Sequence, residues 1–108
     1  MRGLTDLEEL DRAFSALSHR TRRAILLVLH ANGGAMTSGA IANLFSNTWQ
    51  TTSRHLGLLE EAGLIEIRLR GRTHDYRLRT DRLQALVGGW LDRFEDPETS
   101  VSPKGSQG

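Results

Sequence analysis

The chain has 108 residues, enough for one domain built around a single hydrophobic core. It contains no cysteine, which excludes disulfide bonds and thiolate metal sites. Its N-terminus lacks the apolar core of a signal peptide, and no apolar run approaches the roughly 20 residues that cross a membrane, so we expect a cytoplasmic protein without membrane contact.

The net charge of +1 conceals an uneven distribution of charge along the chain. Thirteen of the 14 basic residues are arginines, and residues 67–79 contain five of them against one acid. Residues 1–17 instead contain four acids and two arginines. A charge run is usually a solvated surface of mixed sign. Because arginine suits bidentate contacts with phosphate and guanine, the concentration in residues 67–79 favours a nucleic-acid partner.

Apolar periodicity predicts the first two helices. Leucine and phenylalanine recur every three or four residues over residues 4–17, which indicates an amphipathic helix. A second helix is predicted from Ser18 or His19 to His30, and its apolar content places it in the core. Asn32, Gly33 and Gly34 tolerate positive φ and are expected to end it.

Two further helices are predicted with a very short turn between them. Thr37 or Ser38 caps a helix over residues 38–45, whose Ile41, Leu44 and Phe45 are expected to face inward. After the turn at residues 46–48, Thr48 caps a helix over residues 49–62, and Gly63 is the expected left-handed terminator. This arrangement is a helix-turn-helix, in which the second helix reads the DNA groove.

A β-hairpin and one more helix complete the domain. Apolar and polar residues alternate over residues 65–70, a turn follows at residues 70–73, and Tyr76 and Leu78 mark the return strand. The fifth helix is predicted from Thr80 or Asp81 to Phe94. The predicted fold is therefore mainly α with a small hairpin, a winged helix-turn-helix spanning residues 1–95, and residues 96–108 form a tail with too little apolar content to fold.

Several motifs resemble the ArsR family of winged-helix repressors. These are LSHRTRRAIL at residues 17–26, Ile41-Ala42, TTSRHLGLLEEAGLI at residues 51–65, and Gly71-Arg72 followed by Tyr76-Arg77-Leu78. The match covers about residues 10–92 and keeps the order and spacing of the family. The resemblance implies a homodimeric DNA-binding regulator that represses transcription and releases DNA on a signal.

The chain departs from the metal-sensing branch of that family. Residues 37–42 stand where that branch places cysteines, and they contain none. The last helix offers Asp81, Asp92 and Glu95 but no histidine, and carboxylates alone bind transition metals weakly. The four histidines also lack the i, i+4 spacing of a zinc site. We therefore expect no metal site and no cofactor.

The predicted DNA contacts lie on the fourth helix and on the hairpin tip. Glutamine suits adenine, arginine suits guanine, and a threonine methyl can meet the methyl of thymine. The groove-facing residues are predicted to be Gln50, Thr51, Ser53 and Arg54. Thr48 caps the helix and touches a phosphate, Arg70 and Arg72 contact the DNA backbone or minor groove, and Trp49 packs. His55 is counted with the DNA contacts, although an inward, near-core position is an equal alternative.

Several other arginines are predicted to have structural roles in place of, or beside, DNA contact. One or two of Arg68, Arg77 and Arg79 are predicted to pair with Glu66 or Asp75. Arg20, Arg22 and Arg23 begin the second helix, where cations oppose the helix dipole. That cost indicates a specific role, either a phosphate contact or an ion pair with an acid of the first helix, and the ion pair is preferred for at least one of them.

The first and last helices carry more apolar surface than a small wing fold can cover, which predicts a dimer interface. Its predicted residues are Leu4, Leu7, Phe14, Leu83, Val87, Trp90, Leu91 and Phe94. A two-fold dimer would space its reading helices about one DNA turn apart, roughly 34 Å. Within the last helix, Gly88 and Gly89 indicate either close approach of the partner or a local kink.

The sequence favours a DNA-binding regulator over other classes. It has no Gly-rich phosphate loop, no Ser/His/Asp arrangement and no paired acids in a pocket-forming region, so an enzyme is not expected. The preferred function is a homodimeric repressor that occludes a promoter at a pseudo-palindromic operator in double-stranded DNA. The alternative is a winged-helix protein-interaction module without specific DNA binding. The effector, a small molecule or a protein, is unknown.

Overall fold

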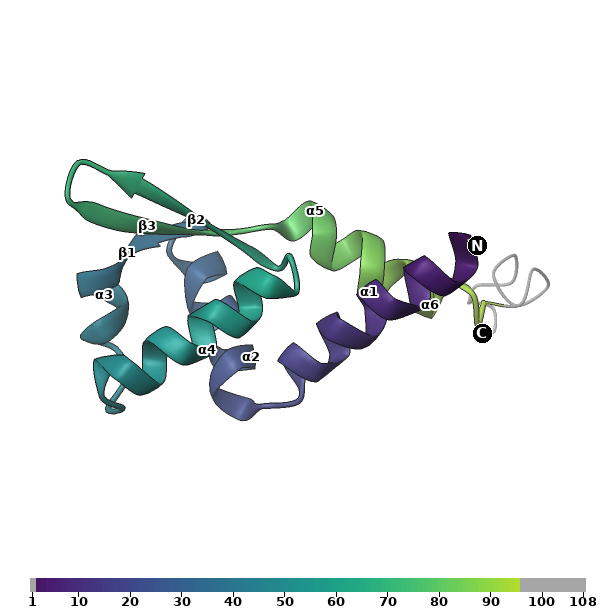
Figure 1. Ribbon diagram of the computed structural model, residues 1–108, viewed down its shortest axis with the longest axis horizontal. Helices are drawn as coiled ribbons and strands as arrows, with labels where there is room; N and C mark the ends of the chain where they lie inside the picture. Colours follow the sequence, from purple (N-terminus) through teal and green to yellow (C-terminus); the bar gives the residue numbers. More distant parts are fainter. Residues whose placement is uncertain (1, 96–108) are drawn as a thin grey trace, which may run out of the picture.

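A computed structural model describes residues 2–95, with side-chain surroundings from residue 7 onward. The predicted tail at residues 96–108 and the Leu4 side chain therefore lie outside the described residues. Helix α1 (Arg2–Leu17) leads into α2 (Arg20–Ala31), strand β1 (Ala35–Thr37), α3 (Ser38–Ala42) and α4 (Trp49–Glu61). The hairpin β2 (Ile65–Arg70) and β3 (Thr73–Leu78) follows (Figure 1).

The C-terminal helix is interrupted. It begins as α5 (Thr80–Leu83), passes through a π-helical turn (Gln84–Gly88) and ends as α6 (Gly89–Asp92). The predicted helix from Thr80 or Asp81 to about Phe94 is thus present from Thr80 to Asp92, and its π-helical turn was not predicted. A Cβ added at Gly89 would meet no atom within 4 Å, so contacts inside one chain do not require the glycine there. Both glycines keep helical backbone angles, with φ of −64° at Gly88 and −62° at Gly89, so close approach of a partner and a local kink both stay predictions.

The core lies where α2, α3 and α4 meet the sheet. Its fully buried large side chains are Ile25, Leu29, Ile41, Leu56, Leu59 and Leu64. Gly63 follows α4 with φ of +79°, as predicted, and lets the chain turn directly into β2. Thr37 and Thr48 cap α3 and α4 by accepting the amides of Ala40 and Thr51, each at 3.2 Å.

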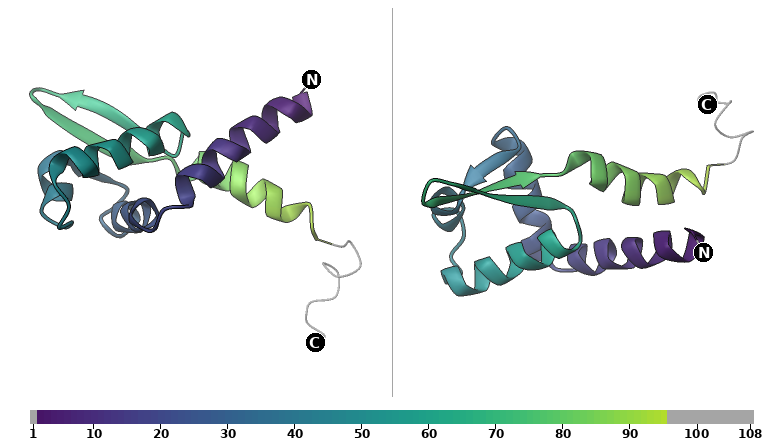
Figure 2. Two further views of the ribbon diagram at one scale, coloured as in Figure 1. Left: turned by 60° about the horizontal axis from the view of Figure 1, so that its bottom comes forward. Right: turned by 45° about the horizontal axis from the view of Figure 1, so that its top comes forward.

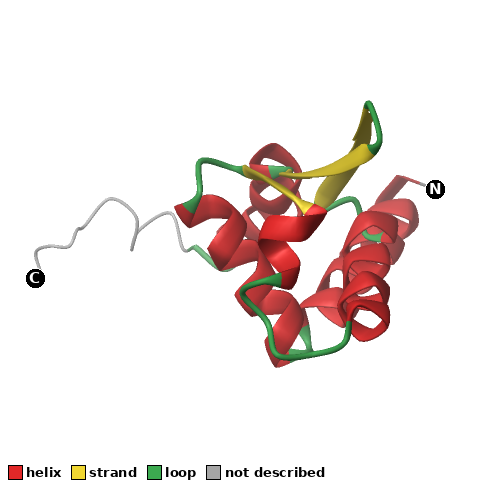
Figure 3. Cartoon of the chain, turned by 90° about the vertical axis from the view of Figure 1, so that its left-hand side faces the viewer, coloured by secondary structure: helices red, strands yellow, loops and turns green. Residues whose placement is uncertain are grey.

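The hairpin belongs to a three-stranded antiparallel sheet in the order β1-β3-β2, which adds one strand to the predicted pair. In β1, Met36 pairs with Tyr76 of β3. Beyond β1 the two longer strands continue alone, so the hairpin projects from the helices as the wing (Figure 3). The winged helix-turn-helix fold is thus confirmed, and the sheet fastens the wing to the core through β3.

Three apolar residues were placed wrongly. Leu27 of α2 is 70% exposed, Leu44 is 55% exposed because α3 ends at Ala42, and Leu69 near the wing tip is 66% exposed. The core predictions for Ile41 and Ile65 hold.

The two ends of the molecule differ in character. The wing and the start of α4 lie at one end, whereas α1 and the C-terminal helix run side by side toward the other (Figures 1 and 2). The rings of Phe14 and Trp90 pack edge to face between these two helices, with their centroids 5.1 Å apart. The surfaces predicted to contact DNA and a second copy therefore lie at opposite ends of the molecule. No described helix is long and apolar enough to span a membrane.

Candidate nucleic-acid interface

Helix α4 has one buried face and one free face. Thr52, Leu56 and Leu59 are buried. Gln50, Ser53 and Arg54 are exposed, and Thr51 is half-buried. The Thr48 hydroxyl donates to the Thr51 hydroxyl at 3.1 Å as well as capping the helix, so this pair is oriented at the helix start. The exposed side chains present an amide, a hydroxyl and a guanidinium in one helical turn, which is the chemistry that reads base edges.

His55 faces the core, so its assignment as a DNA contact was wrong. Its side chain is among the buried polar groups, 8% exposed, and its Nδ1 lies 3.1 Å from Nη1 of Arg22. Burial lowers the pKa of His55 below the usual 6.5, and the nearby positive charges of His19, Arg22 and Arg54 lower it further. The inward-packed His55 thus belongs to the buried face of α4 and not to its exposed face.

Trp49 occupies the first position of α4 beside the wing. It is 39% exposed, and its ring meets that of Tyr76 in β3 at 6.5 Å, edge to face. This contact agrees with the packing role predicted for it. Burial raises the pKa of the Tyr76 hydroxyl, with a smaller contribution from Glu60. The pair ties the start of the reading helix to the wing strand.

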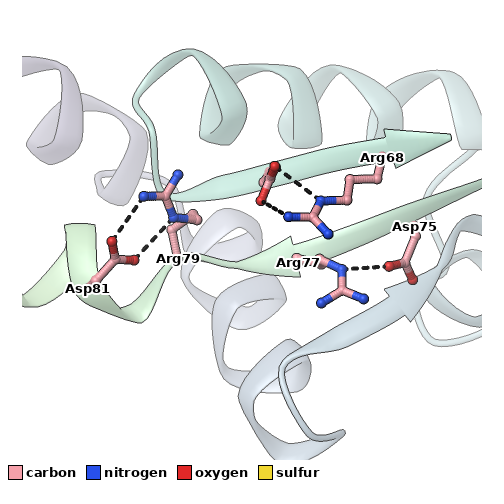
Figure 4. Close-up of polar contacts among 6 residues, drawn as sticks. Arg68, Asp75, Arg77, Arg79 and Asp81 are labelled. Atoms are coloured by element: carbon pink, nitrogen blue, oxygen red, sulfur yellow. Dashed lines mark hydrogen bonds and ion pairs between the residues drawn. The ribbon is translucent and has the colours of Figure 1, made fainter.

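Three of the wing arginines are paired with acids two residues away (Figure 4). Arg68 bonds Glu66 at 3.1 Å and Arg77 bonds the buried Asp75 at 2.9 Å, as the sequence predicted for this set. Arg79 pairs instead with Asp81 at the start of α5, at 2.9 Å. The Arg79 hydrogen bond lowers the pKa of Asp81 from 3.8 to about 2.

The wing tip is different. Arg70 ends β2 and Arg72 lies in the turn, and both are exposed. Within residues 7–95 neither side chain forms an ion pair. Gly71 between them adopts φ of +61°, which permits the tight turn. Two free guanidinium groups at a projecting tip suit contact with phosphates.

Within residues 7–95, the arginines that begin α2 form no ion pair with an acid. Arg22 donates from Nε to the carbonyl of Ala16 at 2.7 Å, and Arg23 donates to the carbonyl of Leu17 at 2.8 Å. They satisfy carbonyls at the C-terminus of α1, where positive charge is favourable. The predicted ion pair was therefore wrong, because the compensating group is backbone of the preceding helix. Arg20 is exposed.

The predicted interface residues gather on α1 and the C-terminal helix. Leu7, Leu91 and Phe94 are 52%, 57% and 71% exposed, and Trp90 is 36% exposed. The rings of Trp90 and Phe94 meet at 5.0 Å. Phe14, Leu83 and Val87 are half-buried, and Leu83 also packs against the core. Across residues 7–95, no cluster of three or more His, Cys, Asp or Glu side chains could hold a metal ion.

Comparison with known proteins places these features in a family. A helix-turn-helix domain model matches residues 17–68. The chain is 36% identical over 85 residues to the transcriptional repressor SdpR of Bacillus subtilis, a match that covers 79% of this chain and 91% of that protein. It is also 32% identical over 79 residues to a CadC homolog, a cadmium resistance regulatory protein of Staphylococcus aureus, covering 73% and 64% of the two chains.

Solved structures agree with the sequence matches. An ArsR family transcriptional regulator superposes with a TM-score of 0.70 and 29% identity, over 80% of this chain and 86% of the other. A homodimeric winged helix-turn-helix DNA-binding domain from Mycobacterium bovis gives a TM-score of 0.67 and 31% identity, over 88% and 89%. The relatives and structures are transcriptional regulators rather than enzymes. The chain belongs to the ArsR family of winged helix-turn-helix transcriptional regulators.

Proposed function

We propose that this DNA-binding regulator is a homodimeric repressor that occludes a promoter by occupying a pseudo-palindromic operator. The observation that carries the proposal is that the start of α4, with its exposed side chains, lies at the same end of the molecule as the wing tip (Figure 1). At that tip Arg70 and Arg72 form no ion pair within residues 7–95. Gln50, Ser53 and Arg54 read bases in the major groove, with Thr51 at the edge of that set. Thr48, Arg70 and Arg72 contact the DNA backbone beside it.

The dimer is proposed from the opposite end of the molecule. The exposed Leu7, Leu91 and Phe94 lie on the two helices that run away from the wing. Pairing two copies through this surface covers apolar side chains and presents two reading helices to successive turns of DNA. The homodimeric state of the Mycobacterium bovis domain supports this arrangement. The repressor role is supported by the similarity to SdpR.

The signal that releases DNA is proposed to involve neither a metal nor a thiol. The chain has no cysteine, and its last helix has no histidine. A small molecule or a protein partner is the remaining class of effector. A protein with this function acts where the chromosome is, so we place it in the cytoplasm.

The proposal is tested by fluorescence anisotropy with the duplex upstream of the protein's own gene. We expect tight binding that survives a scrambled duplex as competitor. Weak binding that is equal on both duplexes would require a second screen against genomic fragments. If that screen selected no sequence, the winged helix would be a protein-interaction module instead.

Arg54→Ala and Arg72→Ala are expected to weaken DNA binding in different ways. Arg54 projects from the reading face, so its loss should cost about 1–3 kcal/mol on the operator and relax specificity. Arg72 lies in the wing turn, so its loss should weaken operator and random duplexes by similar factors. Titration of both variants on both duplexes measures this, and equal losses on the two duplexes for Arg54→Ala would contradict the assignment.

A further inference from the structure

One guanidinium connects the arm made by α1 to the recognition helix α4. Arg22 donates from Nε to the carbonyl of Ala16 at 2.7 Å and from Nη2 to that of Ser15 at 3.4 Å, both at the end of α1. Its Nη1 lies 3.1 Å from Nδ1 of His55 in α4. We name this set, Arg22 with His55 and the two carbonyls, the Arg22 joint. Through it the helix that carries the proposed dimer surface is bonded to the helix that reads DNA.

The joint requires one protonation state of His55. A guanidinium has only donors and stays charged, so Nδ1 of His55 must accept, which leaves its proton on Nε2. Protonation at Nδ1 would remove the acceptor and place a second positive charge about 3 Å from Arg22. The joint is therefore closed with neutral His55 and open with charged His55.

The surroundings of His55 do little to offset such a charge. On α2, the His19 ring lies 4.5 Å from the His55 ring, centroid to centroid, and Arg22 is on the same side. On α4, Arg54 is adjacent, and Glu61 lines a hollow of about 130 Å³ beside Arg22 together with Arg12 of α1. Glu61 is thus the one acid among these groups, against two further arginines and a histidine. Burial first, and then the charges of His19, Arg22 and Arg54, lower the pKa of His55.

We infer that Arg22 and His55 are positioning residues that hold the recognition helix at a set angle to the dimerisation arm, so that specific DNA binding weakens as acid opens the joint. This inference rests on the proposed function. In a dimer bound to two half-sites, a rotated α4 mismatches both grooves, although neither residue touches a base.

The direction of the pH effect follows from the pKa. The folded-state pKa of His55 is below the 6.5 of an unfolded chain. Above that unfolded value both states are neutral and the stability from the closed joint is fully present. As pH falls below it, the unfolded chain takes up the proton first and the stability is progressively lost. Operator affinity should fall at lower pH than this, where the folded protein itself takes up the proton on His55.

The experiment compares operator and random duplexes from about pH 7.5 to about pH 5.5 with the full chain. Acid adds positive charge to the protein, so random binding should strengthen or stay level. Operator affinity should fall by about tenfold for each unit by which the pKa of His55 is lower in the operator-bound protein than in the free protein. If acid weakens operator binding while random binding strengthens or stays level, the cause is a misplaced α4. A loss of charge attraction would instead weaken binding to both duplexes.

Two matched variants test whether protonation of His55 causes the pH dependence of operator affinity. His55→Asn keeps an acceptor near the position of Nδ1 but cannot be protonated, so its operator affinity should become independent of pH. His19→Asn removes the neighbouring ring while preserving the cap that His19 now gives α2 through Thr21, so it should retain the pH dependence. Thermal unfolding by circular dichroism at each pH confirms that the variants are folded.

Arg22→Lys tests the other half of the joint. It keeps the charge but cannot make the guanidinium's three contacts together, so operator affinity at neutral pH should fall while random binding is retained. The inference would be overturned if the operator affinity of His55→Asn kept the pH dependence of the native protein. It would also be overturned if Arg22→Lys lost affinity equally for operator and random duplexes. Absence of sequence-specific binding at pH about 7.5 would instead refute the proposed function, and NMR titration of His55 would then still report whether the joint opens.

Discussion

Leu91→Asp is expected to convert the protein into a monomer and to lower operator affinity by about 10²–10⁴-fold. Leu91 is 57% exposed on α6, so the substitution leaves the fold of one chain intact. In the proposed dimer the new carboxylate would be buried without a partner, which is costly. A single chain engages one half-site and loses the advantage of linked binding. Light scattering should report the 12.0 kDa species, and anisotropy should report the affinity.

Gln84→Glu is the matched control. It adds the same charge at an exposed position of the same helical segment, outside the predicted interface residues. It should remain dimeric and bind the operator as the native protein does. A Leu91→Asp variant that is still dimeric and still binds tightly would show that the copies pair through another surface.

Leu59→Ala is expected to lower the free energy of unfolding by about 2–5 kcal/mol. Leu59 is fully buried in α4, so truncation removes apolar contacts and leaves a cavity where α4 packs on the core. The loss should lower the urea concentration at the unfolding midpoint, while the dependence of the free energy of unfolding on urea concentration stays unchanged. A loss of this size is a large part of the stability of a small domain.

Leu58→Ala offers a neighbouring comparison on the same helix. Leu58 is 40% exposed, so its truncation should cost less than about 1 kcal/mol. The sequence left its orientation open, and the exposure decides it. Equal losses for Leu58 and Leu59 would mean that another surface covers Leu58 in solution.

Local signals made much of this fold predictable. The apolar period defines α1, α2 and α4, and Thr48 and Gly63 mark the two ends of the recognition helix by a side-chain cap and a positive φ. Strand β1 was missed because Ala35–Thr37 is too short to show alternation, and only its register with β3 creates it. The exposure of Leu44 followed from the early end of α3, a boundary of the kind that periodicity places poorly.

The site was predictable where chemistry is local and not where it depends on tertiary partners. Exposed Gln50, Ser53 and Arg54 could be placed by helical spacing alone. His55 lies three residues after the buried Thr52 and four before the buried Leu59, so helical spacing also favours its inward position. What spacing could not show is its contact with Arg22, which is 33 residues away in sequence. The role of Arg22 and Arg23 was misjudged because the dipole of α2 was weighed without the unsatisfied carbonyls that end α1.

The acids that pair with arginines along the wing also affect how strongly DNA affinity should depend on salt concentration. Arg68, Arg77 and Arg79 already form ion pairs within the chain, so in the proposed complex Arg70 and Arg72 are the arginines that would displace cations from DNA. Each phosphate neutralised changes the logarithmic dependence of affinity on salt by about −0.9. Two wings of two free arginines contribute about −4 in a dimer, against about −9 if all five on each wing took part. The affinity of the proposed complex should therefore change less steeply with ionic strength than the arginine count alone predicts.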